Sequence, residues 1–283
     1  MASKWWSSED VAVVTGANKG IGYEIARLLA EAGFRVIVTA RNPELGAAAL
    51  EKLKGLPSIS DPSALGFERL DISDKASIEA FKAQLEARHP GRLVVLVNNA
   101  GVAFKGDVFG AEECKATIDT NFRGTADACE ALAPLLAEGR GRIINVSSGA
   151  GDLSRIPGAA LRAQFESPVD RPQLEALADK FVADIKAGSY KAEGWPASMY
   201  GISKALETAY TRVLAKQLEG RGIMVNAVCP GWCATDMSSW GGPRTAAQGA
   251  DTPVWLATLP PPGVDGGELV TGAFWRDRQR IPF

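Results

Sequence analysis

Tyr200 and Lys204 are the two side chains whose types and spacing suggest chemistry. They lie four residues apart in the run Ser-Met-Tyr-Gly-Ile-Ser-Lys, residues 198–204, and residues with that separation share one face of a helix. A tyrosine phenol ordinarily titrates near pH ~10, and a neighbouring ammonium favours its ionised form. The pair is therefore suited to donate a proton to a carbonyl oxygen, but the spacing is common and needs support from the rest of the chain.

A glycine-rich loop near the N-terminus predicts a dinucleotide site. The apolar run 11–15 is followed by Gly16-Ala-Asn-Lys-Gly-Ile-Gly22, then by a helical pattern at 23–32 and a second apolar run at 34–39. Glycines let the backbone approach a pyrophosphate, and the helix N-terminus offers free N–H groups to phosphates. A mere tight turn is the alternative, but a strand before the loop and a helix after it are the context that a dinucleotide site requires.

Two cations near this loop favour a cofactor that carries a 2′-phosphate. Lys19 lies inside the loop and Arg41 directly follows the second apolar run, where no acid occurs before Glu44. An NAD site places an acid in that region to receive the ribose hydroxyls. Arginine instead binds phosphate in a forked geometry. The sequence therefore predicts NADP(H), the alternative being that both cations are simply solvated.

Short apolar runs and helical patterns alternate along the rest of the 283 residues. Strands are expected at 66–70, 93–97, 142–146 and 223–228, with 268–270 closing the sheet, and helices at 43–54, 77–87, 111–136 and 198–218. Within the third of these helices, Gly124 suggests a point of close packing. This alternation predicts a doubly wound parallel sheet, covered by helices on both faces, in a single Rossmann-type α/β domain over 1–283.

Residues 151–197 interrupt the alternation, because this stretch contains no expected strand. The segment 172–186 carries an apolar stripe that includes Leu174, Leu177 and Phe181, and its spacing is that of an amphipathic helix. We therefore expect a helical insertion before Tyr200. It either packs onto the domain, forms a wall of the substrate site or covers a subunit interface.

Polar residues follow two of the expected strands. Asp71 comes after 66–70, where its carboxylate is placed to accept from an adenine amino group, and Asn99 comes after 93–97. Open α/β sheets bind ligands at these carboxyl ends. Asp and Asn are also ordinary turn residues, so neither position is decisive by itself.

Composition excludes several classes of function. The formal net charge is −2 and the chain is 46% hydrophobic, so we expect neither nucleic acid nor an anionic membrane as partner. With one histidine, and four cysteines whose spacing fits neither a zinc site nor a short secreted framework, no metal site is expected. No run reaches the ~18 apolar residues of a spanning helix, and the N-terminal segment has no signal-peptide core. We expect a cytoplasmic protein that acts on a small molecule.

Taken together, these motifs resemble the short-chain dehydrogenase/reductase family over almost the whole chain. The matching segments are Thr15-Gly-x-x-x-Gly-Ile-Gly22, Asn98-Asn-Ala-Gly101, Thr120-Asn-Phe-x-Gly124, Asn145-Val-Ser-Ser148, Tyr200-x-x-x-Lys204 and Pro230-Gly-Trp232. Within the family the chain looks most like the monomeric, NADPH-dependent carbonyl reductases, a design that the plant salutaridine and menthone reductases share. Three features are the reason: the loop Gly16-Ala-Asn-Lys-Gly-Ile-Gly22, the run Glu193-Gly-Trp-Pro-x-Ser-x-Tyr-Gly-x-x-Lys204, and the insertion. The insertion separates Ser148 from Tyr200 by 52 positions, more than in typical members.

The resemblance implies a catalytic set of four residues. Tyr200 is expected to be the general acid, while Lys204 binds the nicotinamide ribose and lowers the pKa of the tyrosine. Ser148 is expected to hydrogen-bond the substrate carbonyl, with its neighbour Ser147 as the fallback. Asn121 is expected to hold a water in a proton relay behind Lys204, although a structural hydrogen bond is the alternative.

The resemblance also implies the remaining contacts and the reaction. Cofactor contacts are expected from Gly16, Asn18, Lys19, Gly20, Ile21, Gly22, Arg41, Asp71, Ile72, Asn99, Tyr200, Lys204 and Thr235. Trp232 and Met237 are expected to reach the substrate or, with equal weight, to be core residues. The implied reaction is the reduction of aldehydes, ketones or quinones with NADP(H) by a monomer. Two alternatives stay open, a dehydrogenase of a specialised alcohol such as a terpenoid or steroid, and a non-catalytic NADPH-binding regulator.

Overall fold

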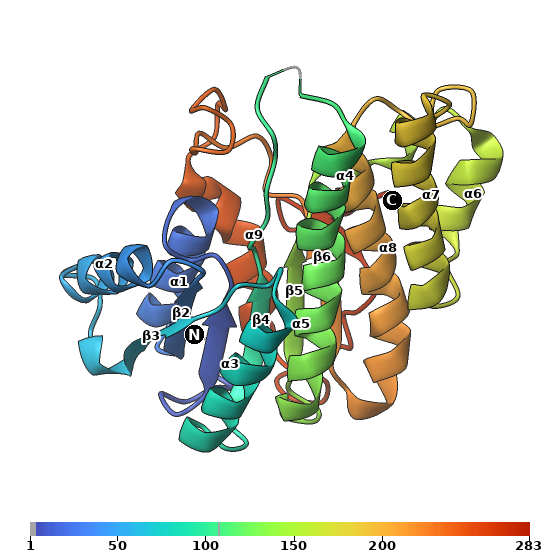
Figure 1. The fold of residues 1–283 in the computed structure, drawn as a ribbon. Helices are drawn as coiled ribbons and strands as arrows, with labels where there is room; N and C mark the ends of the chain where they lie inside the picture. Colours follow the sequence, from blue (N-terminus) through green and yellow to red (C-terminus); the bar gives the residue numbers. More distant parts are fainter. Residues whose placement is uncertain (1–3, 107) are drawn as a thin grey trace.

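An eight-stranded sheet forms the centre of the protein in the computed structural model, which describes residues 4–106 and 108–283 (Figure 1). Residues 1–3 lie outside the described part. They belong to the N-terminal segment in which the sequence shows no signal-peptide core. The strands are β1 Val11–Val14, β2 Arg35–Ala40, β3 Leu65–Arg69, β4 Leu93–Asn98, β5 Arg142–Val146, β6 Met224–Val228, β7 Phe274–Arg276 and β8 Gln279–Ile281. Their order is β3-β2-β1-β4-β5-β6-β7-β8, and all neighbours are parallel except β7 and β8.

Helices cover both faces of this sheet, as the alternating pattern predicts. They are α1 Gly20–Glu31, α2 Pro43–Lys54, α3 Lys75–Arg88, α4 Ala111–Ile118, α5 Thr125–Leu132, α6 Ala159–Glu166, α7 Arg171–Ala187, α8 Met199–Leu218 and α9 Ala246–Thr258. Alternate residues of β1 enter different cores: Val11 and Val13 pack with α3, α4, α5 and α8, whereas Ala12 and Val14 pack with α1, α2 and α9. The fold is the doubly wound α/β architecture predicted from the sequence.

The C-terminal edge of the sheet differs from the prediction. Residues 268–270 do not form the closing strand; β7 and β8, from the tail, take that place. The predicted segment still runs beside β6, but its bonds there pass through side chains. Asn226 Nδ2 donates to the Val270 carbonyl at 2.7 Å, and Val270 N donates to Met224 Sδ at 3.3 Å. Side-chain pairing of this kind replaces the regular ladder of a strand.

The single helix predicted over 111–136 is divided in the structure. A π-helical turn, Asp119–Gly124, separates α4 from α5, and a short 3₁₀ turn follows α5. Gly124 is the close packing point that the sequence suggests, since a Cβ there would stand 2.4 Å from the Ile72 carbonyl oxygen. The wider turn therefore sits directly against the segment that follows β3.

The insertion packs onto the domain. Asp170 caps α7 by accepting from Gln173 N, and Gly188 ends the helix with a φ of 73°. Leu177 and Phe181 are buried against α4 and α8, and α7 runs alongside α8 (Figure 1). Arg171 joins the two parts through ion pairs to Asp127 and Glu130 of α5. In the described part of the chain, no helix combines the length and apolar character needed to cross a membrane.

Candidate active site

The first turn after β1 has the shape that a dinucleotide loop needs. Gly16 and Gly20 have φ values of 61° and 60°, a region that other L-residues rarely adopt. Gly22 is also sterically required, because a Cβ there would lie 2.3 Å from Asn99 Nδ2. That amide donates to the carbonyls of Thr15 at 3.0 Å and Gly16 at 3.2 Å. The ends of the neighbouring strands β1 and β4 are thereby locked together at the switch point of the sheet.

A cleft of about 750 Å³ opens at these strand ends. The residues of the predicted site that line it are Gly16, Asn18, Lys19, Gly20, Ile21, Arg41, Asp71, Ile72, Asn99, Tyr200, Lys204, Thr235 and Met237. Four predicted residues lie elsewhere. Gly22 packs beneath the loop, Asn121 is fully buried, Ser148 sits beside the cleft wall, and Trp232 is 63% exposed outside it.

The glycine-loop end of the cleft carries positive charge. The first turn of α1 contains no acidic residue, so the N–H groups and the dipole of the helix are free to favour an anion. Arg41 is exposed at the end of β2. Lys19 instead forms an ion pair with Asp236 at 2.6 Å, which the sequence did not indicate. The hydrogen bond and charge of Lys19 hold the pKa of Asp236 below its usual value.

Asp71 and Thr235 are each engaged locally. Asp71 Oδ1 accepts from the backbone N of Ser73 at 3.0 Å and from its hydroxyl at 2.6 Å, which rigidifies the turn after β3. Thr235 faces the glycine loop from the opposite wall, since a Cβ on Gly20 would lie 3.4 Å from its methyl group. Both residues line the cleft, and each is held there by its local contacts.

The predicted catalytic pair, Tyr200 and Lys204, lies in the first turns of α8. Ser198 caps the helix by accepting from Gly201 N at 3.0 Å, and this cap fixes the turn that carries Tyr200. The pKa of Tyr200 is raised because burial outweighs the opposing effects of the Lys204 charge and of a hydrogen bond with Ser148. Ser147 is occupied elsewhere, with its hydroxyl 2.6 Å from Thr208 Oγ1. Of the two serines, Ser148 is the one that interacts with the phenol.

Asn121 is held by bonds within the protein. Its Oδ1 accepts from Val102 N at 2.8 Å, while its Nδ2 donates to the Val102 carbonyl at 2.9 Å and to Ser203 Oγ at 3.0 Å. The π-helical turn presents this side chain to the loop after β4, and a Cβ on Gly101 would lie 3.1 Å from Asn121 Oδ1 and 3.7 Å from Lys204 Nζ. The structural bond and the position behind Lys204 thus occur together, and the water relay stays a prediction.

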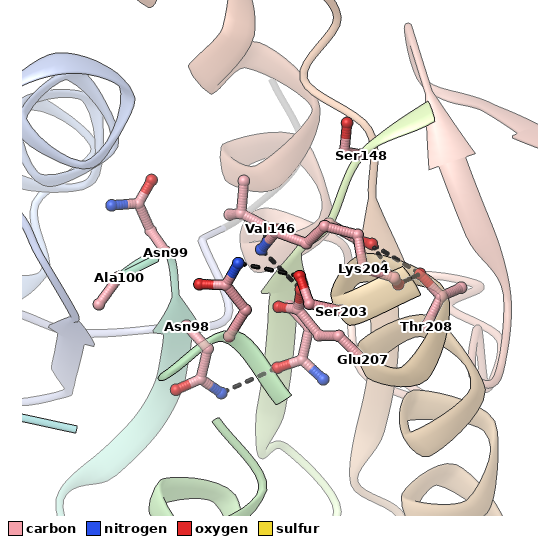
Figure 2. Close-up of polar contacts among 12 residues, drawn as sticks. Asn98, Asn99, Ala100, Val146, Ser148, Ser203, Lys204, Glu207 and Thr208 are labelled. Carbon is pink, nitrogen blue, oxygen red and sulfur yellow. Dashed lines mark hydrogen bonds and ion pairs between the residues drawn. The ribbon is translucent and has the colours of Figure 1, made fainter. Parts of the chain in front are cut away.

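Glu207 is the functional candidate that the sequence reasoning missed. Lys204 Nζ donates to Glu207 Oε2 at 2.6 Å and to the Val146 carbonyl at 2.8 Å (Figure 2). The side chains of Lys204 and Glu207 are only 4% and 1% exposed. Burial raises the pKa of the Glu207 carboxyl to about 7, although Lys204 opposes the rise. The available signal was a glutamate three residues after the predicted catalytic lysine, on the same helix.

Residues 10–161 match the family model described as short chain dehydrogenase. The chain belongs to the short-chain dehydrogenases. Residues 184–252 also match the model described as enoyl-(acyl carrier protein) reductase. The chain is 40% identical to carbonyl reductase [NADPH] 1 of Mus musculus, over 98% of this chain and 99% of that protein. It is also 40% identical to carbonyl reductase [NADPH] 1 of Homo sapiens, over 89% and 91%.

Solved structures of this family have the same fold. Salutaridine reductase from Papaver somniferum superposes with a TM-score of 0.84 at 30% identity, over 94% of this short-chain dehydrogenase and 99% of that chain. Menthone neomenthol reductase from Mentha piperita gives 0.81 at 31% identity, over 95% and 98%. The family resemblance and the fold predicted from the sequence are both confirmed.

Proposed function

We propose that this protein reduces aldehydes, ketones or quinones to alcohols with NADPH. The observation that carries the proposal is the placement of Tyr200 and the buried Lys204 on the wall of a cleft whose other end is the glycine loop. The similarity to two NADPH-dependent carbonyl reductases over nearly their whole length supports both the reaction and the cofactor.

The residues of the cleft fit NADP(H). The glycine loop and the acid-free start of α1 suit a pyrophosphate. Arg41 and Lys19 both line the cleft, where they would hold the 2′-phosphate, and Asp71 and Ile72 line it where the adenine would lie. When bound, the cofactor supplies the hydride, and the protein contributes orientation and electrostatics.

The remaining chemistry is the transfer of one proton to the carbonyl oxygen. Ser148 hydrogen-bonds that oxygen and stabilises the negative charge that grows on it. Tyr200 donates its phenolic proton to the same oxygen, so that an alcohol and a phenolate result. The ammonium of Lys204 stabilises the phenolate, and Asn121 holds the relay that returns a proton.

Apolar side chains at the mouth of the cleft favour substrates with a hydrophobic body. Met237 and Trp240 both line it, and they are 43% and 68% exposed. Exposed aromatic and methionine side chains of this kind are suited to cover an apolar ligand. We therefore replace Trp232 by Trp240 as the proposed substrate contact, since Trp232 lies outside the cleft.

Turnover of a substrate panel tests the proposal. NADPH oxidation is followed by absorbance with quinones, aldehydes and cyclic ketones, for the wild type, Tyr200→Phe and Tyr23→Phe. The last is a matched control, because the buried Tyr23 hydroxyl has no hydrogen-bond partner within the described residues. We expect Tyr200→Phe to retain NADPH binding and to lose at least ~100-fold in turnover, as for a lost general acid. Tight NADPH binding without turnover by the wild type would favour the regulator instead.

We also propose that the protein is a monomer in the cytoplasm, with a small-molecule substrate and no nucleic-acid partner. The insertion supports the first point, because α7 covers the outer face of α4 that would otherwise be open to another subunit. The four cysteines are all free and buried, which suits a reducing compartment. Sedimentation that gives a tetramer would reject the monomer.

A further inference from the structure

Glu207 is a buried carboxylate that the proposed mechanism does not use. It lies on α8 one turn beyond Lys204, and its side chain is 1% exposed. Its Oε2 accepts from Lys204 Nζ at 2.6 Å (Figure 2). A buried ionised group without a partner is strongly disfavoured, so the two side chains depend on each other for their charge.

Apart from Lys204, the groups that surround Glu207 are polar and uncharged. From α5, Cys129 faces it, and the pKa of that thiol is raised first by burial and then by the Glu207 charge. From the sheet, Asn98 Nδ2 donates to Asn145 Oδ1 at 2.8 Å, and Asn145 Nδ2 donates to Thr211 Oγ1 at 2.8 Å. Within the described chain, Lys204 is the cation whose charge lowers the pKa of the Glu207 carboxyl, against the effect of burial.

The geometry restricts the direction of the lysine ammonium. An ammonium has three N–H donors, and two of them are used by Glu207 Oε2 and by the Val146 carbonyl at 2.8 Å. Lys204 also lines the cleft. With two donors fixed on the inner side, the third is left to point toward the cleft, where Tyr200 and the cofactor ribose are expected.

We propose that Glu207 is a positioning residue that orients the Lys204 ammonium and sets the pH at which the Tyr200–Lys204 pair loses its first proton. The inference rests on the proposed function, because it concerns the same proton donor. With Glu207 ionised, the three groups carry no net charge before the tyrosine titrates. Without that negative charge the site begins at +1, and a positive site releases a proton more readily.

The charge argument has support in the individual groups. The pKa of Lys204 is raised, because the attraction of Glu207 and Tyr200 outweighs the opposing effect of burial. The pKa of Tyr200 is raised first by burial, against the lowering effect of the Lys204 charge, and the Glu207 charge raises it further. Since these groups titrate as a coupled set, removal of the carboxylate charge shifts the set as a whole to lower pH.

The test compares pH profiles of kcat/KM for carbonyl reduction in the wild type, Glu207→Gln, Glu207→Leu and Glu207→Asp. Activity falls at high pH as the acid is lost. We expect Glu207→Gln and Glu207→Leu to shift this alkaline limb to lower pH by about one unit, the usual effect of one nearby charge. Asp should keep the limb in place while lowering kcat, because the shorter carboxylate holds Lys204 less well. Glu219→Gln, an exposed change of equal charge, should leave the profile unchanged.

A purely structural role gives a different pattern. Stability and kcat would then change without movement of the alkaline limb, and that result would overturn the proposal, as would a shift in Asp equal to that in Gln. If both neutral variants fail to fold, Glu207→Asp still tests the proposal, since a displaced limb in a variant that keeps the charge would overturn it.

A spectroscopic titration separates this inference from the proposed function. Formation of the Tyr200 phenolate is followed by ultraviolet difference, with Tyr200→Phe identifying the signal among the four tyrosines. A lower phenolate pKa in Glu207→Gln supports the inference even when the wild type reduces none of the substrates. Turnover by the wild type with an unchanged phenolate pKa in the variant overturns the inference alone.

Discussion

Substitution of Gly124 by alanine should disturb two parts of the site together. Gly124 ends the π-helical turn that carries Asn121, and it is buried. It faces the carbonyl of Ile72, which lies in the segment after β3 that borders the cleft. A single methyl group added here therefore separates the part of the site that holds Asn121 from the part that holds Asp71 and Ile72.

The size of the effect follows from one distance. The added Cβ would stand 2.4 Å from the Ile72 oxygen, whereas ordinary contact begins at 3.4 Å, so the backbones must part by about 1 Å. Overpacking of this kind costs about 1–3 kcal/mol, while exchange of a helical glycine for alanine returns about 1 kcal/mol. The expected net loss reaches about 2 kcal/mol, and each kcal/mol lowers the Tm of a protein of this size by roughly 2–4 °C.

NADPH affinity is the more decisive measurement. Displacement of Asp71 and Ile72 should weaken binding by about tenfold, which corresponds to about 1.4 kcal/mol. Gly220→Ala is the matched control, because a Cβ at Gly220 meets nothing within 4 Å. We expect Tm and NADPH affinity of the control to equal or exceed those of the wild type. If Gly124→Ala matched the control in both fluorescence titration and thermal unfolding, the steric argument would be refuted.

Three further changes test other parts of the molecule. Arg41→Asp should weaken NADPH binding far more than NADH binding in titrations, and equal effects would remove Arg41 from the 2′-phosphate site. Asp236→Asn frees Lys19 from its ion pair and should strengthen NADPH binding a few-fold at low salt, with the gain lost at high salt; a weaker affinity would argue against a role for Lys19. Phe181→Ala should lower the free energy of unfolding by about 3–5 kcal/mol, since the ring is fully buried and 4.8 Å from that of Trp195; a loss below about 1 kcal/mol by denaturant titration would contradict the packing of the insertion.

The strands at the centre of the sheet were predictable because burial on both faces requires apolar residues at successive positions. β4 is buried at every position from Leu93 to Asn98, and such a strand reads as a continuous apolar run. The glycine loop was equally clear, since Gly16 and Gly20 need positive φ values that few other residues accept. These features are encoded locally, by the residues that adopt them.

Other elements depend on contacts with distant parts of the chain, and their sequence signals are weaker. In the turn between β7 and β8, Asp277 and Arg278 have φ values of 50° and 59°. Hairpins that can be predicted from sequence usually carry glycine or asparagine at such positions. Helix α9 is not among the helices predicted from the sequence, and it contains Pro253 and Gly249, two residue types that weaken a helical pattern. Its capping box of Thr245 and Gln248 is the signal that was present.

The same distinction explains why Glu207 escaped notice while Tyr200 and Lys204 did not. Helix α8 is buried on most of its surface, because the sheet lies on one side and α7 on another. Its polar residues therefore form no solvent-facing stripe, and periodicity cannot separate a surface glutamate from a buried one. The decisive property of Glu207 is its partner: a buried carboxylate that would be strongly disfavoured alone is tolerated beside Lys204. A buried acid within one turn of a predicted catalytic lysine should therefore be treated as part of the site, because a buried carboxylate needs a cation beside it and, among the described residues, Lys204 supplies it for Glu207.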